Sequence, residues 1–199
     1  MSSLPCVVIL AAGQGTRYRQ QAGERSDKLL APCLGNDGVV RPVLEQVLCN
    51  IPPQLTRRVL VTSPGRTAVI GLAEAYACQP ILLQSEGMGE SLAAGVRASA
   101  DAPGWLILLG DMPFIRPETI ERVAAGLLRS SVSVAQKGGR YGHPVAFANS
   151  HGSDLMNLRG DRGARSLFTG VSVEAIDVTD QGIFWDIDTP EALVHTPNN

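Results

Sequence analysis

The sequence predicts a three-layer α/β/α fold, in which a mainly parallel, twisted sheet is covered by helices on both faces. Short, almost continuously apolar runs alternate with longer segments whose apolar residues recur at helical spacing. This alternation is typical of β–α–β units. The run Trp105-Leu106-Ile107-Leu108-Leu109 carries no polar residue, as expected of a strand that is buried on both faces of a parallel sheet.

The expected elements follow in chain order. Strands are predicted over residues 6–10, 59–62, 80–83, 105–109, 131–135 and 144–147, and helices over 43–49, 66–76, 89–99 and 117–128. Pro42 and Pro117 stand where helices begin, because proline is favoured in the first turn. Segments 20–25 and 35–41 are polar and contain glycine, so flexible loops are expected there. Beyond residue 151 the alternation weakens into short helical and extended pieces.

Composition limits the class of protein. The 199 residues predict one domain, with an apolar fraction of 44% and a net charge of −2. No basic face indicates nucleic acid as a partner, and no apolar run approaches the roughly 20 residues of a membrane span. The amino terminus lacks the features of a signal peptide. Four cysteines without a C-x-x-C pair favour reduced thiols, so a cytoplasmic protein is expected.

The first strand ends in a glycine-containing loop, Ala11-Ala12-Gly13-Gln14-Gly15, which Thr16, Arg17 and Lys28 follow. Glycine lets the backbone turn tightly and bring its amides close to a ligand. Amides beside a guanidinium and an ammonium suit a polyphosphate. The loop is neither a Rossmann fingerprint, since Tyr18 replaces the third glycine, nor a Walker P-loop. It favours an anionic nucleotide, although an ordinary tight connection would explain the loop alone equally well. Segment 20–25 is expected to form a lid over this site.

A carboxylate follows the most hydrophobic predicted strand. Ligands of open α/β sheets bind beyond the carboxyl ends of the strands. Pro113 cannot continue a central strand and Gly110 lets the chain bend, so Asp111 is expected to stand in that crevice. A carboxylate beside a phosphate-binding loop is typical of a Mg²⁺ site that substrate phosphates complete. A helix-capping role is the weaker interpretation, because Pro117 opens the next helix several residues later.

Asp186 and Asp188 lie two residues apart on an extended segment, so their side chains point to the same face. One of them is expected to meet Asp111 as a second metal ligand. Capping of a helix at Thr189-Pro190 would explain Thr189 but not both acidic residues.

Three further segments are candidates to line the site. Segment 84–92 follows a strand and opens a helix, where amides meet a base or a phosphate. Segment 138–144 offers His143, for which structural and site-lining roles are equally consistent. Segment 160–165 contains Asp161 and two arginines, which either contact a phosphate or face water.

These motifs together resemble the nucleotidyltransferases with a MobA-like domain, and within them the molybdenum cofactor cytidylyltransferases. The resemblance covers nearly the whole chain and rests on Leu10-Ala11-Ala12-Gly13-x-Gly15-x-Arg17, Lys28-Leu29-Leu30, Gly87-Met88-Gly89-x-Ser91-Leu92, Gly110-Asp111-Met112-Pro113, Gly142-His143-Pro144-Val145, Gly160-Asp161-x-Gly163-Ala164 and Asp186-Ile187-Asp188-Thr189-Pro190. The guanylyltransferase branch is less similar, because it usually carries Leu-Ala-Gly-Gly in the first loop and asparagines at the positions of Asp186 and Asp188. This chain departs from the cytidylyltransferase pattern by a longer segment between Arg17 and Lys28 and by an insertion at 35–41.

The resemblance implies a single Rossmann-like nucleotidyltransferase domain over residues 1–199, with a nucleotide-binding part at about 1–115 and an acceptor-binding part at about 116–195. It implies a Mg²⁺-dependent transfer of CMP from CTP to the terminal phosphate of molybdopterin, or of the molybdenum cofactor. The products would be the cytosine dinucleotide cofactor and pyrophosphate, with a molybdenum hydroxylase as the expected client enzyme.

The resemblance also implies roles for individual residues. Arg17, Lys28 and Asp111 are the expected catalytic residues, with Arg17 and Lys28 on the β- and γ-phosphates. Asp111 and Asp188 are the expected Mg²⁺ ligands, and Asp186 is the alternative to Asp188. The expected nucleotide-binding residues are Leu10, Ala11, Ala12, Gly13, Gly15, Thr16, Arg17, Lys28, Gln84, Ser85, Gly89, Ser91 and Gly110. The expected acceptor-binding residues are Gly142, His143, Pro144, Asp161 and Gly163.

Two other functions remain open at this point. A nucleotidyltransferase that acts on a sugar or polyol phosphate, or that uses GTP, would need the same phosphate site. A non-catalytic carrier of finished molybdenum cofactor would need neither CTP nor Mg²⁺, and it would leave Lys28 and Asp111 without a role.

Overall fold

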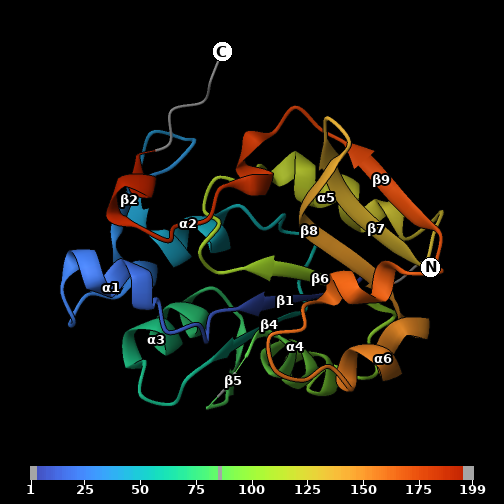
Figure 1. Cartoon of the computed structure of the whole chain (residues 1–199), viewed down its shortest axis with the longest axis horizontal. Coiled ribbons are helices and arrows are strands. Elements are labelled where there is room, and N and C mark those ends of the chain that lie inside the picture. The colour runs from blue at the N-terminus through green and yellow to red at the C-terminus, as the bar shows by residue number, and fades with distance from the viewer. Residues whose placement is uncertain (1–3, 85–86, 195–199) are drawn as a thin grey trace.

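The computed structural model describes residues 4–84 and 87–194, which form a seven-stranded sheet between two layers of helices (Figure 1). The strand order is β5-β4-β1-β6-β8-β7-β9. The strands are β1 (Cys6–Leu10), β4 (Arg58–Thr62), β5 (Gln79–Leu82), β6 (Gly104–Leu109), β7 (Val132–Lys137), β8 (Arg140–Ala148) and β9 (Val173–Asp177). Strand β8 is antiparallel to β6 and β7, and the other pairs are parallel. The predicted mainly parallel sheet is therefore confirmed.

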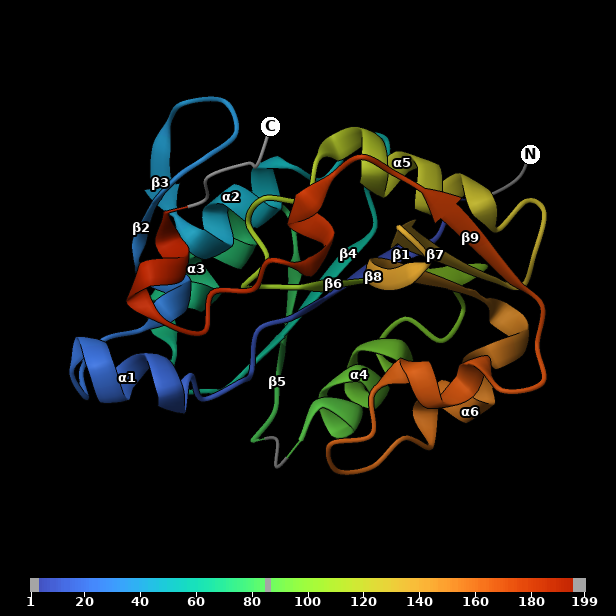
Figure 2. The ribbon, with the colours of Figure 1, turned by 45° about the horizontal axis from the view of Figure 1, so that its top comes forward.

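Helices cover both faces of the sheet because side chains alternate along its strands. Val7 and Ile9 of β1 belong to one core cluster, whereas Val8 belongs to the cluster on the opposite face. The first face packs against α2 (Val43–Cys49), α3 (Thr67–Ala75) and α5 (Pro117–Gly126), and the second against α4 (Met88–Arg97) and α6 (Gly152–Met156) (Figure 2). The three-layer prediction is thus confirmed.

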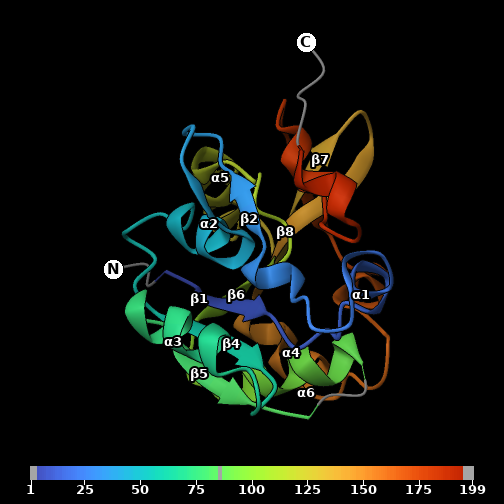
Figure 3. The same ribbon diagram turned by 90° about the vertical axis from the view of Figure 1, so that its left-hand side faces the viewer.

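The connections explain where a ligand site can form. From β1 the chain passes through α2 to β4 on one side, and from β5 it crosses through α4 to β6 on the other side of β1. The order of the strands reverses at this point, and such a switch leaves a crevice beyond the carboxyl ends of β1 and β6. Both strands point toward α1 (Thr16–Ala22), as Figures 1 and 3 show.

The predicted strands and helices are all present, with ends displaced by no more than four residues. Two predicted loops are partly wrong. Segment 20–25 begins inside α1, which Tyr18 anchors in a core cluster and which ends where Gly23 takes a φ of 98°. Segment 35–41 is the turn and last arm of a small hairpin, β2 (Pro32–Leu34) and β3 (Val40–Pro42).

Some elements were not predicted individually. They are α1, α6, β9 and the short 3-10 turns η1 (Lys28–Leu30), η2 (Asn149–His151) and η4 (Gln181–Phe184). The turn η3 (Ala164–Phe168) is among the short helical pieces expected beyond residue 151, and η5 (Pro190–Leu193) begins at the helix start that Thr189-Pro190 indicates. Strand β9 pairs with β7 but is mostly half-buried, so its apolar signal is weak. None of the helices among the described residues is both long and apolar enough to cross a bilayer.

Candidate functional site

The loop after β1 and the turn η1 are packed against each other. Gly15 has a φ of 61°, in the left-handed region that glycine adopts readily, and it precedes α1. A Cβ atom on Gly15 would lie 3.5 Å from Cγ of Lys28. The aliphatic part of Lys28 therefore runs over Gly15, and only 8% of this lysine is exposed.

Four charged side chains from distant segments meet beyond the carboxyl ends of β1 and β6. Nζ of Lys28 lies 2.6 Å from Oδ2 of Asp111 and 3.2 Å from Oδ1 of Asp188. Nη1 of Arg17 donates to Oδ2 of Asp188 at 2.9 Å. The backbone amide of Ile187 donates to the carbonyl oxygen of Asp111 at 2.9 Å, which holds the two acidic loops side by side. We call Arg17, Lys28, Asp111 and Asp188 the charged cluster.

The cluster stabilises its own charges. Burial alone would lower the pKa of Lys28, but the carboxylates of Asp111 and Asp188 raise it above its ordinary value. Burial would likewise raise the pKa of Asp188, but Lys28 and Arg17 lower it. Partial burial raises the pKa of Asp186, and the negative charges of Asp188 and Asp111 add to the effect. Lys28 and Asp188 are therefore both ionised at neutral pH.

A cavity of about 440 Å³ opens beside this cluster. Its walls come from the loop after β1, from η1, from the start of α4, from the end of β6 and from the loop at 161. Its lining includes nine of the predicted residues, Leu10, Ala11, Ala12, Gly13, Thr16, Lys28, Ser91, Asp111 and Asp161. The volume is within the range of small-molecule sites.

Several predicted nucleotide-binding residues lie outside the lining of this cavity. Gly15 and Gly110 contact residues that line it. Gly15 packs against Lys28, and the amide of Gly110 donates to the carbonyl of Leu10 at 2.9 Å. Arg17 stands at the rim, with 80% of its side chain exposed. Gln84 is exposed, and Ser85 lies outside the described residues.

The start of α4 is closed by the loop at 159–162. The amide of Gly89 donates to the carbonyl of Gly160 at 2.8 Å, so it is not directed at the cavity. A Cβ atom on Gly87 would lie 2.3 Å from the carbonyl carbon of Gly160. We call this contact the glycine seam, because it joins the start of α4 to the later part of the chain through backbone alone.

A second cavity, of about 370 Å³, adjoins the first. The two cavities share Leu10, Met88, Leu109 and Asp161 in their linings. Of the predicted acceptor-binding residues, His143, Asp161 and Gly163 line the second cavity. Gly142 and Pro144 do not: Gly142 packs against Ile183, whose carbonyl oxygen would lie 2.5 Å from an added Cβ.

His143 is the histidine of this second cavity. Its Nδ1 atom is buried and has no hydrogen-bond partner within residues 4–84 and 87–194. Burial, and then the charge of Arg165, lower the pKa of His143 to about 4. The ring is therefore neutral at physiological pH, which leaves one nitrogen free to accept a hydrogen bond.

The charged cluster fits a divalent cation. No group of three or more His, Cys, Asp or Glu side chains suited to a metal occurs in the described part of the chain. However, Oδ2 of Asp111 and Oδ1 of Asp188 already converge on one positive atom, Nζ of Lys28. Mg²⁺ is usually bound by one or two carboxylates together with substrate phosphates and water, so two converging carboxylates beside a ligand cavity form a suitable donor set.

Sequence reasoning missed three residues that organise the site. Arg66 forms an ion pair with Asp27, directly behind the glycine-containing loop. Asp180 is buried and accepts hydrogen bonds from the amide of Arg116, the hydroxyl of Thr119 and the amide of Gly182. Asp27 and Arg66 lie 39 residues apart, and Asp180 lies 64 residues from Arg116 and 61 from Thr119, so no local pattern could have revealed these pairs. The contact of Asp180 with Gly182, two residues away, is local.

Comparison with known proteins agrees with this geometry. A family model described as a MobA-like NTP transferase domain matches residues 7–176. The bifunctional protein GlmU of Cereibacter sphaeroides is 37% identical over 150 residues, which cover 70% of this chain and 31% of GlmU. This chain therefore spans about a third of the length of that relative.

Solved structures share the fold. Rv0371c from Mycobacterium tuberculosis, in complex with manganese, has a TM-score of 0.74 at 22% identity and covers 96% of both chains. Molybdopterin-guanine dinucleotide biosynthesis protein A from Archaeoglobus fulgidus has a TM-score of 0.65 at 20% identity, over 94% of both chains. A CMP:2-keto-3-deoxy-manno-octonic acid synthetase complexed with CTP has a TM-score of 0.68 at 15% identity, over 96% of this chain and 95% of that one.

At these identities the solved structures support the architecture, while the family match covers most of the sequence. The chain belongs to the family of MobA-like NTP transferase domains.

Proposed function

We propose that this protein transfers CMP from CTP to the terminal phosphate of molybdopterin, or of the molybdenum cofactor, with the help of Mg²⁺. The products are the cytosine dinucleotide cofactor and pyrophosphate. Residues up to about 115 form the nucleotide side and the later residues form the acceptor side.

The observation that carries this proposal is the pair of adjoining cavities, with the charged cluster at the edge of the first. A transferase must hold two substrates so that their reacting atoms meet. The 440 Å³ and 370 Å³ cavities share Asp161 and three apolar residues in their linings, so two ligands placed in them are neighbours. A carrier protein needs one cavity and has no use for Lys28 beside two carboxylates.

The chemistry follows from charge. An oxygen of the acceptor phosphate attacks the α-phosphorus of CTP, the new P–O bond forms, and the bond to the β-phosphate breaks to release pyrophosphate. The attacking phosphate is already ionised, so the protein needs no general base. Its task is to position two anions and to stabilise the charge that develops on the leaving group.

The residues divide this task. Arg17 and Lys28 bind the β- and γ-phosphates and stabilise the departing pyrophosphate. Asp111 and Asp188 would hold Mg²⁺, which when bound screens the charge of the α-phosphate. The amides of the 10–13 loop and Ser91 contact the nucleotide, while His143 and Asp161 contact the acceptor.

The choice of substrates rests on similarity. The first loop reads Leu10-Ala11-Ala12-Gly13, as in the cytidylyltransferases that this chain resembles. One solved structure with this fold is complexed with CTP, another belongs to a molybdopterin-guanine dinucleotide biosynthesis protein, and a third contains manganese. These likenesses favour a nucleotide, a pterin acceptor and a divalent cation.

The test is a substrate profile of the purified protein. CTP, GTP, UTP and ATP are each combined with molybdopterin, molybdenum cofactor or a panel of sugar and polyol phosphates, with and without Mg²⁺. We expect pyrophosphate release and a dinucleotide product with CTP and a pterin phosphate, and only when Mg²⁺ is present.

Two results would contradict the proposal. Pyrophosphate release with a sugar phosphate but not with molybdopterin would assign another acceptor. Tight binding of molybdenum cofactor without any turnover of CTP would assign a carrier.

A further inference from the structure

Behind the glycine-containing loop, on the side away from the nucleotide cavity, one guanidinium contacts two parts of the chain. Arg66 follows β4 and precedes α3. Its Nε and Nη2 donate to the two carboxylate oxygens of Asp27, at 3.1 and 2.7 Å. Its Nη1 donates to the carbonyl of Ala11 at 2.6 Å and to that of Gly13 at 3.3 Å.

Together with the hydroxyl of Thr62, which also donates to the carbonyl of Ala11 at 3.2 Å, these contacts fix the direction of the loop amides. In a trans peptide the N–H group points away from the carbonyl of the preceding residue. The carbonyls of Ala11 and Gly13 face Arg66, so the amides of Ala12 and Gln14 face away from it. Both of these residues line the nucleotide cavity. Within the described chain, none of the recorded acceptors takes a hydrogen bond from either amide.

Asp27 also fixes the backbone turn that carries Lys28. Its Oδ1 accepts the amide of Leu29 at 3.0 Å and so caps η1, the turn that begins with Lys28. Both members of the pair are well shielded, with 18% of the Arg66 side chain and 22% of the Asp27 side chain exposed. A bidentate Arg–carboxylate pair, with two parallel hydrogen bonds, is stronger and more directional than an ion pair with one hydrogen bond.

We propose that Arg66 and Asp27 are positioning residues for the triphosphate: together they hold the loop amides and the Lys28 ammonium in the arrangement that binds phosphate. Neither side chain touches the substrate. The inference rests on the proposed nucleotide site, but it does not depend on which nucleotide or acceptor is used.

The test measures binding of inorganic tripolyphosphate, and separately of CTP with Mg²⁺, to the full-length protein by calorimetry. We expect Arg66→Met to weaken tripolyphosphate binding by at least about tenfold, the equivalent of one charge-assisted hydrogen bond. Arg66→Lys should bind tripolyphosphate nearly as weakly, because one ammonium cannot donate hydrogen bonds to Asp27 and to both carbonyls at once. Hydrogen exchange of the amide of Leu29, which donates to Asp27, should quicken in both variants.

The matched control is Arg57→Met. Arg57 also forms a bidentate pair, with Asp101. This pair is more exposed than that of Arg66 and Asp27, and Arg57 precedes β4 at the opposite end of the sheet. We expect its binding constants to stay within twofold of those of the unmodified protein.

A charge swap separates positioning from mere stabilisation. Asp27→Arg combined with Arg66→Asp restores an ion pair, but aspartate cannot donate to the carbonyls of Ala11 and Gly13. We therefore expect the swap to remain as weak as Arg66→Met. Recovery of tripolyphosphate binding in the swap would overturn the inference, and so would unchanged binding in Arg66→Met. If Arg66→Met does not fold, the milder Asp27→Asn takes its place, with weaker tripolyphosphate binding expected and unchanged binding contradicting the inference.

Failure of the proposed function gives a different result. If the unmodified protein binds tripolyphosphate but transfers no CMP to a pterin, the assigned reaction is wrong while the positioning role stands. If the unmodified protein binds neither tripolyphosphate nor CTP, the nucleotide site itself is wrong.

Discussion

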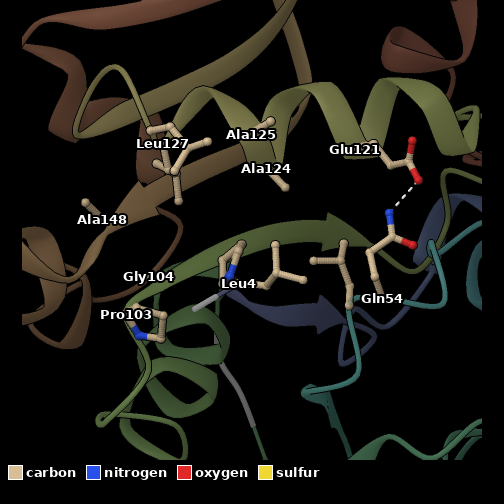
Figure 4. A pocket seen from close by; sticks show the side chains of 12 residues that line it. Leu4, Gln54, Pro103, Gly104, Glu121, Ala124, Ala125, Leu127 and Ala148 are labelled. Carbon is tan, nitrogen blue, oxygen red and sulfur yellow. Dashed lines mark hydrogen bonds between the residues drawn. The ribbon is translucent and has the colours of Figure 1, made fainter. Parts of the chain in front are cut away.

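The two ends of the central strands carry cavities of opposite character. At the amino ends, a cavity of about 660 Å³ is lined by Leu4, Pro103, Ala124, Leu127 and other mostly apolar residues (Figure 4). Two polar side chains in its lining, Gln54 and Glu121, are hydrogen-bonded to each other. At the carboxyl ends, the cavity is smaller, about 440 Å³, yet four charged side chains converge there.

The difference shows that the charged side chains of this fold do not gather at the cavity with the greater volume. The site forms where loops that follow different parallel strands come together, since parallel strands bring their carboxyl ends to one edge of the sheet.

Matched changes of one carboxylate at each end give the strongest test. We expect Asp111→Asn to lower the rate of nucleotidyl transfer by about a thousandfold, as for the loss of a main electrostatic group. Glu121→Gln in the apolar cavity should leave the rate unchanged. Pyrophosphate release under saturating substrates measures both. Equal rates for Asp111→Asn and Glu121→Gln would remove the functional contrast between the ends.

The next test compares two carboxylates at the same end. Asp188 contacts Arg17 and Lys28, whereas Asp186 forms no ion pair within the described residues. We expect Asp188→Asn to lower turnover by about a hundredfold and Asp186→Asn by less than about threefold. Initial rates over a range of Mg²⁺ concentrations give both values. The reverse order would make Asp186 the principal ligand.

The ammonium group of Lys28 lies between the carboxylates of Asp111 and Asp188. In Lys28→Met, Asp111 and Asp188 lose their neutralising charge, so the nucleotide-free protein should bind Mn²⁺ about tenfold more tightly. Electron paramagnetic resonance of free Mn²⁺ measures this directly. Nucleotide binding should weaken in the same variant. Weaker Mn²⁺ binding in Lys28→Met would show instead that the ammonium is needed to hold the carboxylates in place.

The smallest expected effect depends on pH. Burial lowers the pKa of His143 from 6.5 to about 4, so between these values the unfolded chain binds more protons than the folded one. The free energy of unfolding therefore decreases as pH falls from about 6.5 toward 4. In His143→Gln this contribution is missing, and urea titrations at several pH values should show a shallower dependence. An unchanged dependence would mean that the ring is not shielded in solution.

The first half of the fold was predictable because its signals are local. Strands β1 and β6 are continuously apolar, and Asp111 follows one of them directly. Asp188 could be named from its spacing to Asp186. The loop that joins Gly13 to Thr16 could be recognised from glycines and a following basic residue.

The rest depended on contacts between distant residues. Nothing near Asp27 indicates that Arg66 pairs with it. The antiparallel direction of β8 follows from its pairing with β6, not from its composition. Strand β9 is mostly half-buried, so its apolar residues give no clear alternation. The hairpin at β2 and β3 is fixed by Gln46, which donates to the carbonyls of Cys33 and Val39.

The glycine seam also matters for protein engineering. Gly87 and Gly89 pack directly on the backbone of Gly160, so any side chain larger than hydrogen at position 87 would push the loop at 159–162 outward. A chimera that grafts the later part of a relative onto this chain must therefore import both sides of that contact together. Libraries that shuffle the two halves should place their crossover elsewhere, or else carry residues 87–89 and 159–162 as one inherited block.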